Sequence, residues 1–367
     1  MKYPLNTPYL YGNEKKYLCD VIDSGWLSRG EYNKRFEAEF AKFCGVKYAL
    51  SVTSGTVAVQ VLLMGAGLRN KKVAIPAYTC MSVAQAVVHA PCIPIFVDIE
   101  LDSYGIDFNS LVRMYKREKF DAVLLNHLYG YIAKDTEKIQ NWCKKNNVML
   151  LEDASEAHGA ESKLGIAGSL GRGAAFSCRS EKMIGVGEGG IIVTNDKDLY
   201  DQAYYFINDA RPSEKVRYYT TSDGWNFFMP NALGAIGLAQ VEQLSIILQK
   251  KRTLGEKYLK YFKDKARSLH SMTPQRGDKP VFWLNVAILG DSISLIREDL
   301  LQIMADRGIE MRPGFYPLNT LPSYRKYPTD STPNADKVGK RLVAFPSATD
   351  LRPECLKEIF NIFDSII

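Results

Sequence analysis

The chain has 367 residues, of which 46% are hydrophobic and 24% charged, and its formal net charge is +6. These values are ordinary for a soluble enzyme and leave room for two domains. The basic residues are spread along the whole length. The densest basic stretches, 69–72 and 250–252, are short, which argues against a nucleic-acid-binding surface.

The seven cysteines are scattered, with no CxxC pair and no metal-ligand spacing. This pattern fits reduced thiols in a cytoplasmic protein and predicts no metal site. Residues 1–5 lack the apolar stretch of a signal peptide, and no apolar run approaches the ~18 residues of a membrane span. We therefore expect a soluble, cytoplasmic protein that does not enter a membrane.

Hydrophobic periodicity predicts alternating helices and strands through the first part of the chain. The predicted helices are 13–24, 33–44, 57–64 and 134–146, and the predicted strands are 48–52, 73–76, 94–97, 122–126 and 149–151. Such alternation is typical of an α/β domain with a mainly parallel sheet.

The pattern changes after about residue 230. A long helical stretch is predicted over 231–263, then a strand near 282–289 and helices near 294–307 and 353–365. We expect a large α/β domain over residues 1–240 and a smaller α+β domain over 241–367.

Lys182 lies in a glycine-rich turn between two strand-like stretches, 174–177 and 191–194. A lysine held in this way can act as a nucleophile, forming a Schiff base with pyridoxal phosphate and then moving a proton. On these residues alone, a solvated hairpin lysine is the alternative.

Three glycines after this lysine, at positions 185, 187 and 190, match the dinucleotide-binding pattern GxGxxG. That pattern requires a helix after the last glycine, so that the helix N-terminus meets the pyrophosphate. Here a strand-like stretch follows at once. We therefore reject a nicotinamide-binding interpretation.

Two further motifs sit at predicted strand ends. Ser-Gly-Thr at 54–56 precedes a helix and is suited to binding an anion, although an ordinary helix N-cap is the alternative. Glu152 and Asp153 follow a buried strand, where a carboxylate can keep a pyridine nitrogen protonated. An acidic first helical turn is the alternative there. His158 fits a structural histidine better than a functional one.

The order of these motifs resembles the DegT/DnrJ/EryC1/StrS group of sugar aminotransferases, which are fold-type I pyridoxal-phosphate enzymes. The resemblance covers nearly the whole chain. The matching segments are 12–14, 25–30, 36–40, 54–56, 76–79, 96–98, 127–130, 152–153, 187–190, 224–227, 312–317 and 345–347.

The resemblance implies roles for individual residues. Lys182 matches the Schiff-base lysine, Asp153 the partner of the pyridine nitrogen, and Glu156 the position at the cofactor's phenolic oxygen. The positions matching phosphate contacts are Gly55, Thr56 and Ser177. Asn226 matches an asparagine that reaches the cofactor phosphate of the neighbouring subunit, which implies a homodimer with shared active sites.

The chain departs from the family pattern in three places. Cys80 stands where the family usually places an aromatic ring over the cofactor. Arg179 and Glu181 add charges before the lysine, and they either read the substrate or pair with each other. Asn319 replaces a common histidine in a loop that borders the substrate site in relatives.

The resemblance implies amino transfer from L-glutamate to the keto carbon of a nucleotide-linked sugar, for surface polysaccharide or O-antigen biosynthesis. The motifs most resemble perosamine synthases, which aminate C4 of GDP-4-keto-6-deoxymannose. A UDP- or dTDP-linked ketosugar, aminated at C4 or C3, and a non-catalytic regulatory protein remain alternatives. Lys182 argues against the sugar 3-dehydratase branch, whose members carry histidine at this position.

Overall fold

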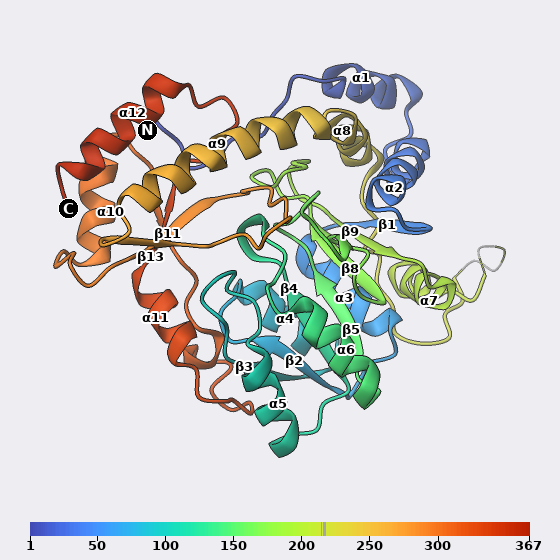
Figure 1. Ribbon diagram of the computed structural model, residues 1–367. Helices are drawn as coiled ribbons and strands as arrows, with labels where there is room; N and C mark the ends of the chain where they lie inside the picture. The colour runs from blue at the N-terminus through green and yellow to red at the C-terminus, as the bar shows by residue number, and fades with distance from the viewer. Residues whose placement is uncertain (214, 216–217) are drawn as a thin grey trace.

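The computed structural model describes residues 1–367 except 214, 216 and 217, and it contains two main sheets (Figure 1). The larger sheet has seven strands in the order β1–β9–β8–β5–β4–β2–β3. Their bounds are β1 Tyr48–Val52, β2 Lys72–Pro76, β3 Ile93–Val97, β4 Ala122–Asn126, β5 Met149–Asp153, β8 Gly173–Ser177 and β9 Gly190–Thr194. Five neighbouring strands run parallel, whereas β9 is antiparallel to both β8 and β1. The expected α/β class with a mainly parallel sheet is confirmed.

Helices cover this sheet because its strands are apolar on both faces, and every residue of β4 and β9 is buried. The helices of this part are α1 Glu14–Ser24, α2 Glu31–Cys44, α3 Gly55–Gly65, α4 Met81–His89, α5 Phe108–Arg117, α6 Thr136–Asn146, α7 Lys197–Ile207 and α8 Asn231–Glu242. Helix α3 packs on β8 and β9, so its N-terminus is fixed beside the ends of these strands.

The second sheet has four antiparallel strands in the order β10–β11–β13–β12. The strands of this sheet are β10 Leu269–Ser271, β11 Asn285–Leu289, β12 Arg312–Pro313 and β13 Leu342–Phe345. The helices of this part of the chain are α9 Leu244–Asp264, α10 Arg297–Asp306, α11 Pro333–Arg341 and α12 Pro353–Asp364. A separate core of buried side chains, including Tyr258, Phe345 and Phe363, fills the space between this sheet and its helices. The domain boundary predicted at residue 240 falls near the end of α8 and stays a prediction.

The helical stretch predicted over 231–263 forms two helices and not one. The chain bends by 61° between α8 and α9, at Gln243. Helix α8 packs on α1 and α2, whereas α9 runs on toward the second sheet, and this change of packing partners accounts for the bend. Shorter elements complete the fold: β6 Glu161–Ser162, β7 Gly165–Ile166, and the 3₁₀ turns Leu128–Gly130 and Leu318–Thr320.

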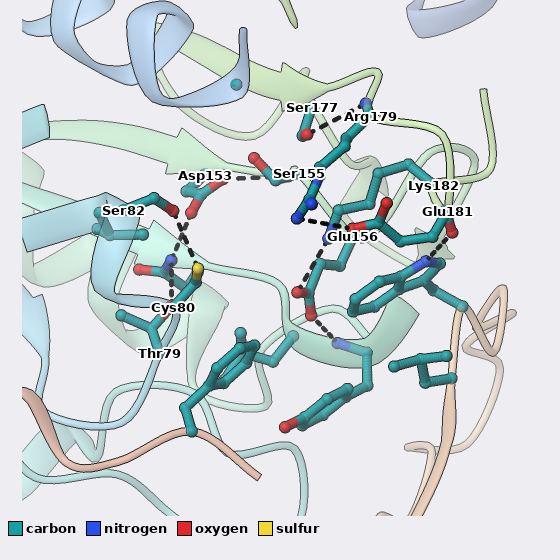
Figure 2. Close-up of a pocket in the computed structure, with 18 of the residues that line it drawn as sticks. Thr79, Cys80, Ser82, Asp153, Ser155, Glu156, Ser177, Arg179, Glu181 and Lys182 are labelled. Atoms are coloured by element: carbon teal, nitrogen blue, oxygen red, sulfur yellow. Dashed lines mark hydrogen bonds and ion pairs between the residues drawn. The ribbon is translucent and has the colours of Figure 1, made fainter. Parts of the chain in front are cut away.

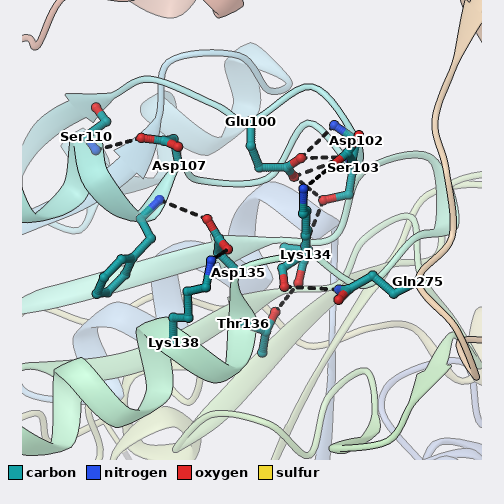
Figure 3. A network of polar contacts seen from close by, with 12 residues as sticks. Glu100, Asp102, Ser103, Asp107, Ser110, Lys134, Asp135, Thr136, Lys138 and Gln275 are labelled. Carbon is teal, nitrogen blue, oxygen red and sulfur yellow. Dashed lines mark hydrogen bonds and ion pairs between the residues drawn. The ribbon is translucent and has the colours of Figure 1, made fainter.

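A polar network shapes the loop that follows β3 (Figure 3). The buried carboxylate of Glu100 accepts hydrogen bonds from the backbone N–H groups of Asp102, Ser103 and Gly105 and from the Ser103 hydroxyl. These bonds satisfy an acid whose pKa burial raises. The loop holds the ring of Tyr104 edge-on against Tyr129.

Across the described ranges, no single helix is long and apolar enough to cross a bilayer; α8 and α9 satisfy that criterion only jointly, as a bent pair. The same residues contain no cluster of histidine, cysteine or acidic side chains suited to a metal ion.

Candidate active site

A cavity of about 480 Å³ opens where β4, β5 and β8 end. Ligand sites in open α/β sheets form at the carboxyl ends of strands, because the loops there diverge. The cavity gathers residues predicted from distant parts of the sequence. Those that line it are Gly55, Thr56, Cys80, Asp153, Glu156, Ser177 and Lys182.

Lys182 lies in the connection between the antiparallel strands β8 and β9, as its flanking patterns predict. Backbone hydrogen bonds hold this connection: Ser180 N–H donates to Gly187 O and Lys182 N–H to Arg179 O. The side chain is only 10% exposed, and Nζ lies 3.2 Å from Glu156 Oε1 (Figure 2). Strand β9 begins at Gly190, so the last glycine of the GxGxxG pattern is followed by a strand and not by a helix. This confirms the reason for rejecting dinucleotide binding.

Glu156 is buried opposite Lys182. Its Oε2 accepts a hydrogen bond of 2.8 Å from the backbone N–H of Tyr129, a residue with left-handed backbone geometry (φ 53°). Burial raises the pKa of Glu156, and the ammonium of Lys182 opposes this shift. Glu156 can therefore hold a proton within reach of the lysine amine.

Asp153 ends β5 and is also buried. Its Oδ2 accepts from Asn126 Nδ2 at 2.7 Å, and its Oδ1 accepts from Ser155 N–H at 3.1 Å. The register of β4 and β5 places Asn126 directly beside Asp153. Burial raises the pKa of Asp153, whereas nearby Lys182 lowers it. Sequence reasoning missed Asn126, whose role depends on strand pairing.

The N-terminus of α3 and the end of β8 form a narrow cradle. Ser54 caps the helix, its Oγ accepting from Val57 N–H at 3.2 Å. A Cβ on Gly55 would lie 2.6 Å from Ser177 Cβ, so only glycine allows these backbones to come this close. The cradle combines hydroxyl groups with helix N-terminal N–H groups, which suits an oxyanion such as a phosphate.

Aromatic side chains form another wall of the cavity. The rings of Trp283 and Phe315 lie nearly parallel to that of Tyr129, at 6.3 and 5.9 Å between centroids. Lys182 Nζ lies 3.5 Å from the centroid of the Trp283 ring. Trp283 comes from the chain before β11, and no local signal in the sequence marks it. Cys80 is half-buried, and its Sγ accepts a hydrogen bond from Ser82 Oγ.

The added charges before the lysine pair with each other at the cavity. Arg179 lies 3.4 Å from Glu181 and 3.3 Å from Glu188, and all three side chains line the cavity. Asn319 does not line it, and its Nδ2 donates to Thr332 Oγ1 at 3.1 Å. In this chain the replacement of the family histidine thus lies outside the cavity.

Asn226 also lies apart from this cavity. It is exposed and pairs with Asn208 through a single antiparallel bridge. Its predicted contact is with the cofactor of a second subunit, and that contact stays a prediction.

His158 is buried beside the rings of Phe40 and Phe176. Across the described part of the chain, neither of its ring nitrogens has a hydrogen-bond partner. Burial, with a smaller effect from Lys182, lowers its pKa to about 3. The histidine is therefore neutral in the folded protein at ordinary pH.

Because His158 is buried in its neutral form, we expect the free energy of unfolding to fall as the pH is lowered. Unfolding restores an ordinary pKa near 6.5, so the unfolded chain binds more protons between pH 6.5 and 3, and lowering the pH destabilises the fold. In urea unfolding, the wild type should lose about 1.4 kcal/mol per pH unit more than His158→Leu between pH 6 and 4. Parallel losses in the two proteins would contradict the assignment.

The fold and the cavity define the class of protein: an enzyme of the fold-type I aminotransferases, with a buried lysine paired with Glu156, a second buried acid at Asp153 and an anion cradle. A family model described as the DegT/DnrJ/EryC1/StrS aminotransferase family matches residues 8–364, and the chain belongs to that family. Its members depend on pyridoxal phosphate, so the expected cofactor and activity class are confirmed.

Proteins of similar sequence match this chain along its whole length. The chain is 34% identical to a GDP-perosamine synthase of Escherichia coli O157:H7, covering 100% of this chain and 98% of that protein. It is 33% identical to a GDP-perosamine synthase of Vibrio cholerae, with coverage of 98% and 97%. The Helicobacter pylori aminotransferase PseC, at 23% identity, superposes with a TM-score of 0.92 over 100% of this chain and 99% of that one, a likeness of fold alone.

Proposed function

We propose that the protein transfers an amino group from L-glutamate to C4 of GDP-4-keto-6-deoxymannose. The observation that carries this proposal is full-length similarity to GDP-perosamine synthases in a chain whose cavity retains the lysine and its acidic partners. The product would be a nucleotide-linked amino sugar for surface polysaccharide such as O-antigen, made in the cytoplasm.

The residues of the cavity fit pyridoxal phosphate. The oxyanion cradle of Gly55, Thr56 and Ser177 would hold its phosphate, and a Cβ on Gly55 would close that cradle. Asp153 would face the ring nitrogen, and the buried Oδ1 of Asn126 beside it lacks a hydrogen-bond partner among the described residues. When bound, the cofactor supplies an electron-withdrawing ring that stabilises negative charge on the donor's α-carbon.

The protein's own groups would carry out the proton transfers. Lys182 would hold the cofactor through Nζ, and its amine would take up the proton from the donor's α-carbon. Glu156, 3.2 Å from Nζ, orients that amine and would contact the phenolic oxygen. Trp283, Tyr129 and Phe315 line this part of the cavity with aromatic rings, which would limit the access of water.

The homodimer belongs to the same proposal. Asn226 is exposed and does not line the cavity of its own chain, which is consistent with a contribution to the site of a second copy. Each site would then be complete only in the dimer.

The substrate assignment predicts a preference among nucleotide-linked sugars. The loaded enzyme is incubated with L-glutamate and GDP-, dTDP- or UDP-linked 4-keto-6-deoxy sugars, and the products are measured by mass spectrometry. We expect kcat/KM for the GDP-linked sugar to exceed the others by about tenfold or more, because the similar proteins are GDP-perosamine synthases. Equal inactivity on every 4-ketosugar would contradict C4 amination and direct attention to 3-ketosugars.

A further inference from the structure

Lys251, on α9, carries a buried amine that has no acidic partner among the described residues, and burial lowers its pKa to about 7. Its residue surface is 2% exposed. Nζ donates to three oxygens: Asn6 Oδ1 at 3.1 Å, Trp283 O at 2.9 Å and Ser347 O at 2.5 Å. An ammonium has three N–H donors, so every one is used. Burying a charge without a counter-ion is costly, which calls for a reason beyond packing.

Two of these three partners hold the turn that carries Lys182. Asn6 Nδ2 and Trp283 Nε1 both donate to the backbone oxygen of Glu181, each at 2.6 Å. Glu181 is the residue directly before Lys182. The ring of Trp283 also lies under Lys182 Nζ, at 3.5 Å from the ring centroid. Lys251 therefore binds two residues, Asn6 and Trp283, and each of these binds the turn directly.

The donor and acceptor pattern sets the orientation of the Asn6 amide. Lys251 offers only donors, so the oxygen of the amide must face it. The amide nitrogen then faces the opposite way, toward Glu181 O, which can only accept. An apolar side chain at position 251 would remove one of the two bonds that orient the amide and leave only its bond to Glu181 O. It would also leave the backbone oxygens of Trp283 and Ser347 buried without this donor, at an energetic cost.

We propose that Lys251 is a positioning residue for Lys182: through Asn6 and Trp283 it fixes the Glu181 carbonyl and the aromatic ring that together set the lysine's place in the cavity. The proposal rests on the proposed role of Lys182 as the cofactor-binding lysine. It links α9 and the chain around β11 and β13 to the connection between β8 and β9. The protonated amine suits this task because its three donors satisfy three acceptors from three separate segments.

The first test replaces Lys251 with methionine, which keeps the length of the side chain and removes its donors. Affinity for pyridoxal phosphate and the circular dichroism of the bound cofactor are measured on the apo protein as the cofactor is added. We expect affinity to fall about tenfold, the equivalent of one lost net hydrogen-bond contribution, and the dichroism to change as Lys182 shifts. Lys250→Met is the matched control, since Lys250 is exposed and outside the cavity; it should match the wild type.

Two further variants separate positioning from general stability. Asn6→Asp keeps an acceptor for Lys251 but removes the donor to Glu181 O. Trp283→Phe keeps the backbone oxygen and an aromatic ring but removes the other donor. Both should change the dichroism and affinity of the bound cofactor in the same direction as Lys251→Met. They also decide the question if Lys251→Met does not fold.

The outcomes distinguish this proposal from the proposed function. If the variants lower only the melting temperature while cofactor affinity and dichroism stay at wild-type values, the positioning role is overturned and the enzyme assignment stands. If the wild type itself does not bind pyridoxal phosphate, the role of Lys182 falls and the positioning proposal falls with it.

Discussion

Lys182→Ala should abolish both the visible absorbance of bound pyridoxal phosphate and amino transfer. The side chain is a buried amine of the cavity, 3.2 Å from Glu156, and loss of the proton-transferring group alone costs about 10²- to 10⁴-fold in rate. Absorbance after dialysis against the cofactor and single-turnover transfer from glutamate measure the two effects. Lys163→Ala, which removes an exposed lysine paired with Glu137, should retain both.

Lys182→Ala also tests whether two subunits share each active site. Co-expressed with Asn226→Ala, Lys182→Ala should form hybrid dimers in which one of the two sites has both residues intact. Activity should then return, although neither variant alone is active. If differently tagged hybrids are purified and stay inactive, Asn226 does not act across the subunit interface.

Asp153→Asn should leave the cofactor attached but slow amino transfer. The amide keeps the shape of the carboxylate and loses the negative charge that would keep the ring nitrogen protonated. A preorganised charge of this kind contributes about 10²- to 10³-fold. Stopped-flow measurement of the glutamate half-reaction gives the rate, and absorbance of the resting protein confirms attachment.

The control for Asp153→Asn is Asp201→Asn, which removes an exposed carboxylate paired with Lys197. It should behave as the wild type. A half-reaction in Asp153→Asn within a factor of about three of the wild type would be too small for this electrostatic role and would assign the protonation of the ring to another group.

Local patterns were sufficient for much of the fold and the cavity. The strands at 48–52 and 122–126 were predicted to the residue because short apolar runs between polar turns leave few other solutions. The strand after Gly190 excluded dinucleotide binding without any coordinates. The bend at Gln243 was missed, because it depends on what each half of the helical stretch packs against.

The residues of the cavity also fall into those that the sequence predicted and those that it did not. Residues at strand ends and helix starts, such as Gly55 and Asp153, could be predicted, since a parallel sheet brings these positions to one edge, whereas Ser177 was predicted from the family resemblance. The aromatic wall could not, because Trp283 lies about a hundred residues from Lys182 and reaches it only through the second sheet.

The sequence by itself predicted the class of fold from short-range order, and the resemblance to the family added the roles expected for Lys182 and its acidic neighbours. Tertiary structure alone decided that Arg179 pairs with Glu181 and Glu188, that Asn319 lies outside the cavity, and that Lys251 supports the turn of Lys182. The contacts of Lys251 join segments far apart in sequence, whereas those of Arg179 are local and depend on how the chain turns between β8 and β9. The geometry of the Lys251 contacts follows from how the two sheets pack, which no local pattern specifies.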